Sequence, residues 1–122
     1  MSTRPRRCAV VDDSKVVLDL LLTDAGWDVS THSEVSGLEL RLREWSPDVV
    51  LLDVGMPGVG ERGLRQRVIL LRAATGAKVV LHSAREPADL EQLGQRAGAD
   101  GVFVKSGDLA AMCATLDRFV PR

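Results

Sequence analysis

The chain has 122 residues, of which 16 are basic and 17 acidic, and its formal net charge is −1 at pH 7. This length suits one domain, residues 1–122, and an apolar content of 45 % is enough to form a core. The balanced charge gives no indication of nucleic-acid binding, and no apolar run approaches the roughly 18 residues of a membrane helix. A secretory signal pattern is also missing, so the sequence predicts a soluble cytoplasmic protein.

Short runs rich in Val and Leu alternate with longer stretches in which apolar residues recur at helical spacing. Residues 1–6, which are partly basic, are expected to form a disordered tail. The run Cys8–Val11 predicts the first strand, and the stretch 17–25 predicts a helix that ends at Gly26. In chain order, the remaining elements are expected at 27–30 (strand), 38–45 (helix), 48–52 (strand), 64–75 (helix), 78–81 (strand), 87–97 (helix), 101–104 (strand) and 109–120 (helix).

Five such strand–helix units predict an α/β fold with a parallel sheet and right-handed crossovers. The runs at 48–52 and 78–81 are apolar without alternation, as expected for strands that helices cover on both faces. In open sheets of this kind, functional residues gather at the carboxyl ends of the strands. The residues that end or follow each predicted strand are therefore the first candidates for a site.

Five polar side chains stand at these strand ends. Asp12 and Asp13 follow the first strand, Asp53 ends the third, Ser83 follows the fourth and Lys105 follows the fifth. Each residue alone has a simpler interpretation, because Asp and Ser cap helices and form turns, and a lysine at a strand end is often only solvated. Their joint placement favours a shared site with three carboxylates, one hydroxyl and one ammonium group.

Three carboxylates at one rim repel one another unless a cation or a proton intervenes. Oxygen-only ligands with this much negative charge suit a hard cation such as Mg²⁺, whereas zinc is disfavoured because no His or Cys joins the cluster. An aspartate can also attack phosphorus and form an aspartyl phosphate, whose oxygens a lysine and a hydroxyl can bind. The cluster therefore indicates Mg²⁺-assisted phosphoryl transfer to an aspartate.

The sequence resembles the receiver domain of two-component response regulators over residues 6–120. The resemblance rests on five motifs in the family's order: VVDDS at 10–14, LLDVGMPG at 51–58, LHSA at 81–84, AGAD at 97–100 and VFVK at 102–105. It implies a flavodoxin-like fold, in which a doubly wound (βα)5 three-layer sandwich has a five-stranded parallel sheet in the order 2-1-3-4-5.

The resemblance also implies a role for each site residue. Asp53 would be the phosphoacceptor, Ser83 the switching hydroxyl, and Lys105 the partner of the phosphoryl group. Four residues would hold Mg²⁺: Asp13 and Asp53 directly, Asp12 through water, and Gly55 through its backbone carbonyl. The protein would be no enzyme in the usual sense, because it would only assist its own phosphorylation and dephosphorylation.

The implied partners are proteins. A sensor histidine kinase or a phosphotransfer protein would supply the phosphoryl group. A surface built from residues 88–96, 101–105 and 109–120 would then change and bind a downstream protein, with no direct binding to nucleic acid or membrane. The sequence leaves a homodimer open.

Two positions in the last strand region depart from the family pattern. Val102 stands where the family usually has a switch aromatic, and the neighbouring Phe103 is expected to face the opposite side of the strand and join the core. Ser106 replaces the proline that usually follows the lysine, so a trans bond is expected between residues 105 and 106.

Two further features bear on the site. The loop after Met56 carries about two more residues than the family pattern, which is most simply a tolerated insertion. His82 is expected to point away from Ser83 and to pack in the core. Two alternatives to a phosphorylated switch remain. One is a receiver that binds partners without phosphorylation; the other is an aspartate-dependent phosphatase, which Gly55 disfavours because that class has a second Asp at this place.

Overall fold

The computed structural model describes residues 4–12, 16–56, 59–105 and 109–121. In this part of the chain, parallel strands form a five-stranded sheet in the order β2-β1-β3-β4-β5. The strands are β1 (Arg7–Val11), β2 (Asp28–His32), β3 (Val49–Asp53), β4 (Lys78–Ser83) and β5 (Gly101–Val104). The helices are α1 (Val16–Asp24), α2 (Leu38–Trp45), α3 (Leu64–Thr75), α4 (Pro87–Ala97) and α5 (Leu109–Phe119). The predicted fold class and strand order are confirmed.

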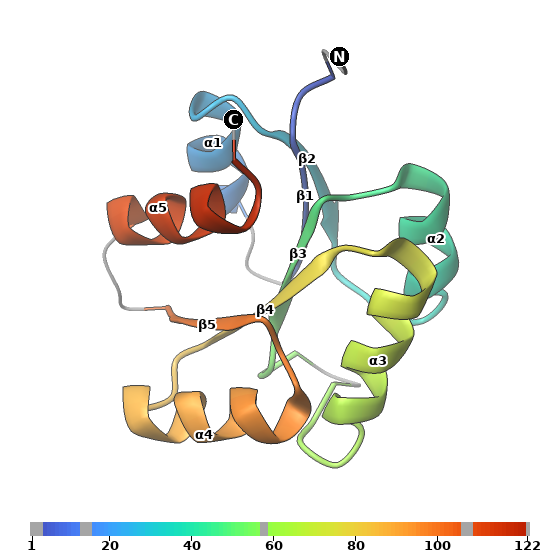
Figure 1. The fold of residues 1–122 in the computed structure, drawn as a ribbon, viewed down its shortest axis with the longest axis vertical. Coiled ribbons are helices and arrows are strands. Elements are labelled where there is room, and N and C mark those ends of the chain that lie inside the picture. Colours follow the sequence, from blue (N-terminus) through green and yellow to red (C-terminus); the bar gives the residue numbers. More distant parts are fainter. Residues whose placement is uncertain (1–3, 13–15, 57–58, 106–108, 122) are drawn as a thin grey trace.

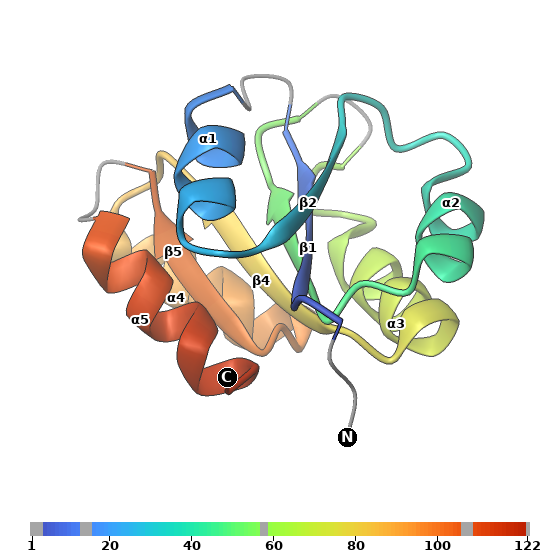
Figure 2. The ribbon, with the colours of Figure 1, turned by 90° about the horizontal axis from the view of Figure 1, so that it is seen from above.

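Helices cover both faces of the sheet and make the fold a three-layer sandwich. Helices α1 and α5 lie on one face, and α2, α3 and α4 lie on the other (Figures 1 and 2). Strand β3 contributes to both cores, because Val49 and Leu51 pack toward α1 and α5 whereas Val50 and Leu52 pack toward the other helices. A strand buried on both faces needs an unbroken apolar run, which is the pattern that its sequence shows.

The predicted bounds differ from the observed ones by a few residues, most clearly around Trp27. This residue was expected to begin a strand, but its backbone N–H donates to the carbonyl oxygen of Leu22 at 3.0 Å, and β2 begins one residue later. Gly26 has a φ of +94°, a left-handed conformation that ends α1 and turns the chain before Trp27. No helix in the described ranges has the length and apolar character to cross a bilayer.

Arg6 was expected to belong to a disordered tail, but it contacts the end of the chain. Its guanidinium donates to Asp117 at 2.6 Å and to the Val120 carbonyl at 2.8 Å, and it lies 4.1 Å from the centre of the Trp27 ring. A cation over an aromatic face combined with an ion pair holds the guanidinium from two directions. Arg6 is therefore part of the folded structure, while residues 1–3 lie outside the described ranges.

Strand β5 lies between two helices that approach it closely. A Cβ atom added to Gly94 of α4 would overlap Val102 Cγ1, and one added to Gly101 would lie 2.9 Å from the ring of Phe119 on α5. Both glycines thus allow a helix to pack against β5 where any side chain would collide. As predicted, Val102 and Phe103 face opposite sides: Val102 packs with the α2–α4 core and Phe103 with the α1–α5 core.

The turn before β5 is fixed by Asp100. Its Oδ2 atom accepts a hydrogen bond from the Val79 backbone N–H at 2.8 Å and another from Arg72 at 2.9 Å. Burial opposes ionisation of this carboxyl, but the Val79 hydrogen bond and the Arg72 charge outweigh burial, so the pKa of Asp100 lies below its ordinary value. The AGAD motif thus links α3, β4 and the start of β5.

The close packing of α4 on β5 predicts the effect of Gly94→Ala. Alanine favours a helix, but its methyl group would overlap Val102, so we expect a net loss of about 1–2 kcal/mol of unfolding free energy in urea titrations. The matched change Val102→Ala vacates that space. The double variant should lose less than the sum of the two single variants, and strict additivity would contradict the contact.

The lowered pKa predicts how Asp100→Asn depends on pH. The ionised carboxylate stabilises the fold above its unfolded-state pKa, and this stabilisation is lost as pH falls through the lower folded-state pKa. At pH 7 we expect Asp100→Asn to lower the free energy of unfolding, measured in urea titrations, by about 1–2 kcal/mol. The difference from the wild type should shrink toward about pH 3. Asp24→Asn, on the exposed end of α1, is the control, and a pH-independent difference at position 100 would contradict the assignment.

Candidate functional site

Asp53 lies at the carboxyl end of β3, where the buried strand meets the site. The residue is only 3 % exposed. Its Oδ1 atom accepts a hydrogen bond from the Gly55 backbone N–H at 2.9 Å, and its Oδ2 atom accepts one from Lys105 Nζ at 3.0 Å. The next residue extends the sheet, because the Val54 N–H donates to the His82 carbonyl at 3.0 Å. The Asp53 carboxylate is thus fixed at both oxygens by groups from two sides.

Asp12 is the second carboxylate of the site and follows β1. It is 1 % exposed, and its backbone N–H continues the sheet by donating to the His32 carbonyl at 3.0 Å. Its Oδ2 atom lies 3.3 Å from Lys105 Nζ. Since β3 lies between β1 and β4 in the sheet, the carboxylates of Asp12 and Asp53 come from neighbouring strands.

Lys105 brings these two carboxylates together from the far side of β4. Its backbone N–H donates to the Ser83 carbonyl at 2.7 Å, which keeps it in line with the sheet just after β5. Burial disfavours the charged ammonium, but the hydrogen bond from Lys105 to Asp53 and the charges of both carboxylates outweigh burial and raise the pKa of Lys105. One ammonium group therefore neutralises only part of the negative charge of two buried carboxylates.

Ser83 ends β4 at the same edge of the sheet. It is 5 % exposed, and its Oγ atom accepts a hydrogen bond from the Arg85 backbone N–H at 3.2 Å. Strand alternation turns Ser83 toward the face opposite that of His82. The hydroxyl is thus engaged within its own loop, on the same rim as the carboxylates.

The loop after β3 contacts the loop that follows Ser83. Glu61 Oε1 lies 2.6 Å from Arg85 Nη1, and both side chains are substantially exposed. An exposed ion pair of this kind contributes little to stability, typically less than about 1 kcal/mol. It does, however, link the two loops that flank Asp53.

Of the predicted site residues, Asp12, Asp53 and Lys105 are in direct contact, and Ser83 shares the Lys105 backbone hydrogen bond. Gly55 is placed beside Asp53 by its own N–H. Two predictions fall on residues that are not described: the metal-ligand role of Asp13 and the peptide bond before Ser106.

The acidic pair fits a hard divalent cation by its chemistry. Asp12 and Asp53 supply carboxylate oxygens at a site with little access to water, and Lys105 is close to both of them. Within residues 4–12, 16–56, 59–105 and 109–121, no three His, Cys, Asp or Glu side chains come close enough to hold a metal ion. A third protein carboxylate would have to come from the undescribed residues, which include Asp13.

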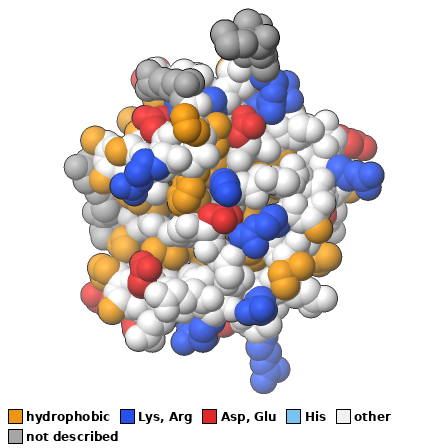
Figure 3. Space-filling view, in the orientation of Figure 1, with side chains coloured by type: hydrophobic (Ala, Val, Ile, Leu, Met, Phe, Trp, Pro, Cys, Tyr) orange, Lys and Arg blue, Asp and Glu red, His pale blue; other side chains and the backbone are white. Residues whose placement is uncertain are grey.

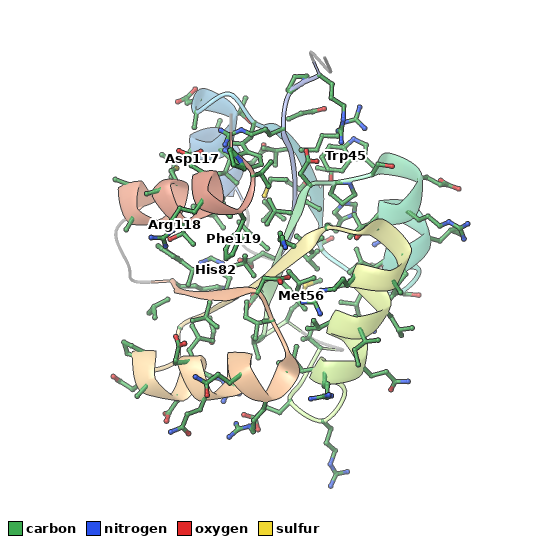
Figure 4. The ribbon with its side chains drawn as sticks, viewed as in Figure 1. Trp45, Met56, His82, Asp117, Arg118 and Phe119 are labelled. Carbon is green, nitrogen blue, oxygen red and sulfur yellow. The ribbon has the colours of Figure 1, made fainter. Side chains whose placement is uncertain are left out.

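Sequence reasoning missed the position of His82 relative to the site. The prediction that it is buried is confirmed, at 5 % exposure, but its Nδ1 atom lies 3.7 Å from Asp12 Oδ2. Figure 4 shows His82 in the interior of the fold, with Met56 nearer to α3. The signal was available, because parallel pairing places His82 directly beside Asp53, and paired residues point to the same face.

The environment of His82 favours its neutral form. Burial is the main cause that lowers its pKa, and the nearby Lys105 charge acts in the same direction. The charges of Asp12 and Asp53 oppose this shift without cancelling it. His82 therefore adds no full positive charge to the acidic pair at neutral pH.

Two curated response regulators are similar in sequence to this chain. The response regulator GacA of Pseudomonas viridiflava is 37 % identical over 111 residues, which cover 87 % of this chain and 51 % of that protein. The DNA-binding response regulator MtrA of Mycolicibacterium smegmatis is 32 % identical over 108 residues, or 86 % of this chain and 46 % of that protein. The chain thus spans about half the length of these curated relatives.

Solved structures share the fold at lower sequence identity. A putative response regulator from Chloroflexus aurantiacus superposes with a TM-score of 0.83 at 21 % identity, covering 98 % of this chain and 100 % of that one. The beryllofluoride-activated receiver domain of Klebsiella pneumoniae RstA gives a TM-score of 0.81 at 22 % identity, covering 96 % and 100 %. The family model described as "Response regulator receiver domain" matches residues 8–117. The chain belongs to this family, the receiver domains of two-component signalling.

Proposed function

We propose that this receiver domain is a phosphorylation switch in which Asp53 accepts the phosphoryl group. The observation that carries the proposal is the buried pair of carboxylates, Asp12 and Asp53, which share the single ammonium group of Lys105. A nucleophile for phosphorus needs a fixed orientation, nearby positive charge and little competing water. The Asp53 carboxylate has all three properties.

The phosphoryl group comes from a phosphohistidine on a sensor kinase or on a phosphotransfer protein. An Asp53 oxygen attacks phosphorus, an O–P bond forms, the N–P bond of the donor breaks, and the imidazole leaves with the bonding electrons. The domain contributes by holding Asp53 in place through the Gly55 N–H and Lys105. It assists its own phosphorylation and dephosphorylation and turns over no external substrate.

The same acidic cluster would hold Mg²⁺. Its ligands would be Asp13, Asp53 and the Gly55 carbonyl, with Asp12 acting through water. When bound, Mg²⁺ supplies positive charge that offsets the charge of the carboxylates and of the phosphoryl oxygens. The oxygen-only donor set and the burial of two neighbouring carboxylates support this assignment.

The added phosphoryl group carries about two negative charges, which attract Lys105 and the Ser83 hydroxyl. A movement of Ser83 would break the present hydrogen bond from Arg85 and shift the loop that leads into α4. Helix α4 packs directly on Val102 of β5 through Gly94, so the change would reach the surface formed by α4, β5 and α5. This surface would then bind a downstream protein in the cytoplasm.

Direct binding to nucleic acid or to a membrane is no part of the proposal for this domain. Basic and acidic side chains are interspersed on the face seen in Figure 3. The net charge of the chain is −1, so its overall balance offers no general attraction to phosphate backbones. The description "DNA-binding" belongs to relatives such as MtrA, of which the match covers 46 %.

One observation favours a second function, in which the domain binds partners without phosphorylation. Val102 stands where the family's switch aromatic is usual, and its tight contact with Gly94 leaves it little freedom to move. In that case the α4–β5–α5 surface would be the same whether or not Asp53 carries a phosphoryl group. The adduct assay below, followed by comparison of amide chemical shifts on this surface, separates the two functions.

The proposed role of Asp53 predicts the outcome of a simple mass measurement. With Mg²⁺ and acetyl phosphate, the intact wild-type protein should gain the mass of one phosphoryl group, and Asp53→Asn should not, because an amide cannot replace the nucleophile. Asp24→Asn is the control and should behave as the wild type. An adduct that persists in Asp53→Asn would contradict the assignment, and no adduct in the wild type would favour the phosphorylation-independent function.

The bridging role of Lys105 predicts two linked effects of Lys105→Met. Without Mg²⁺, urea titrations should give an unfolding free energy about 1–2 kcal/mol lower than that of the wild type, because two buried carboxylates lose a shared hydrogen-bond donor. The partial exposure of Lys105 limits this loss. In calorimetric titration, Mg²⁺ should bind more tightly than to the wild type, because no ammonium competes for the carboxylates. Lys78→Met, at the opposite end of β4, is the control for Mg²⁺ binding and should leave that affinity unchanged. Weaker Mg²⁺ binding in Lys105→Met would refute the competition.

A further inference from the structure

His82 lies beside Asp53 in the sheet and close to Asp12, and the proposed phosphoryl transfer gives it no role. In the sheet it pairs with Asp53 on one side and with Phe103 on the other, so all three side chains lie on one face. Its ring tilts against that of Phe103, with 6.2 Å between the ring centres. A buried polar ring that directly follows the apolar strand segment Val79–Leu81 calls for a polar partner.

That partner is the Asp12 carboxylate. His82 Nδ1 lies 3.7 Å from Asp12 Oδ2, the same oxygen that Lys105 Nζ approaches at 3.3 Å. Strand β3 separates β1 from β4, so both nitrogen groups reach across the end of β3 to contact Asp12. Two nitrogen groups therefore lie near the same Asp12 oxygen, Lys105 Nζ at ion-pair distance and His82 Nδ1 slightly beyond hydrogen-bonding distance.

The contacts of Lys105 and His82 with Asp12 are expected to respond differently to phosphorylation. In the proposed mechanism the Lys105 ammonium also pairs with the phosphoryl group, so its hold on Asp12 weakens when the domain is phosphorylated. His82 is buried, packed against Phe103 and carried by the interior of the strand, so its position does not depend on that change. A separation of 3.7 Å is longer than a direct hydrogen bond, and a small approach of the ring would complete one.

We propose that His82 is a positioning residue for Asp12: its Nδ1–H group orients the carboxylate for a divalent cation, independently of Lys105. The inference rests on the proposed Mg²⁺ site. Residues that contact a metal ligand and orient it contribute to metal affinity, and their loss typically weakens metal binding about 10-fold or more. The position before the strand-end serine thereby becomes a determinant of cation affinity in this chain.

Three substitutions of His82 test whether a hydrogen-bond donor is needed at this position and where the donor must lie. Asn carries an amide nitrogen close to where Nδ1 of His82 lies, Gln carries it about one bond farther out, and Leu carries none. We expect Mg²⁺ titration by calorimetry, without any phosphodonor, to give affinities within about threefold of wild type for His82→Asn and weakened about 10-fold for His82→Leu. His82→Gln should lie near His82→Leu.

The unfolding midpoint of each variant shows whether it is folded, and the ranking of Asn above Gln remains decisive even where His82→Leu does not fold. Equal affinity of the Asn and Gln variants would overturn the positioning role, as would wild-type affinity in a folded His82→Leu. Both outcomes would leave the function of Asp53 intact. A wild-type protein that binds no Mg²⁺ would overturn the proposed function and this inference together.

Discussion

Two carboxylates with almost no access to water share one ammonium group at the carboxyl ends of three strands, and this contact organises the functional edge of the molecule. Asp12 and Asp53 are brought side by side because β1 and β3 are neighbours in the sheet, and Lys105 reaches them from beyond β4. In the part of the chain that the structure describes, these two acidic groups both contact the Lys105 ammonium group. A buried acidic pair of this kind favours additional cations and makes the edge responsive to any change in charge.

Most of the fold could be predicted from the sequence, because parallel strands that are buried on both faces leave unbroken apolar runs. The edge carrying Asp12, Asp53, Ser83 and Lys105 followed from the same rule, since parallel strands place their carboxyl ends together. Side-chain partners could not be predicted so well. The contact of Arg6 with Asp117 joins residues 111 positions apart, and the approach of α4 to β5 depends on a glycine whose packing no local pattern reveals.

The proximity of His82 to Asp12, which the sequence did not reveal, shows the limit of reasoning along a single strand. Alternation correctly turns His82 away from Ser83, but alternation alone does not say what lies on the other face. Only the register between β3 and β4 places His82 beside Asp53, and only the order of the strands places Asp12 within its reach. A site built at one edge of a sheet is therefore better predicted from rows of paired residues across strands than from each strand separately.

The collision that a side chain at position 94 would have with Val102 also bears on how the family pattern could return to this chain. An aromatic ring at position 102 needs more room than valine, and α4 now occupies that room on the Gly94 side. Restoring the aromatic would require α4 to lie farther from β5, which a larger residue at 94 would itself impose. The residues at positions 94 and 102 are thus coupled through packing: a larger side chain at either position is accommodated only if α4 moves or the other residue changes.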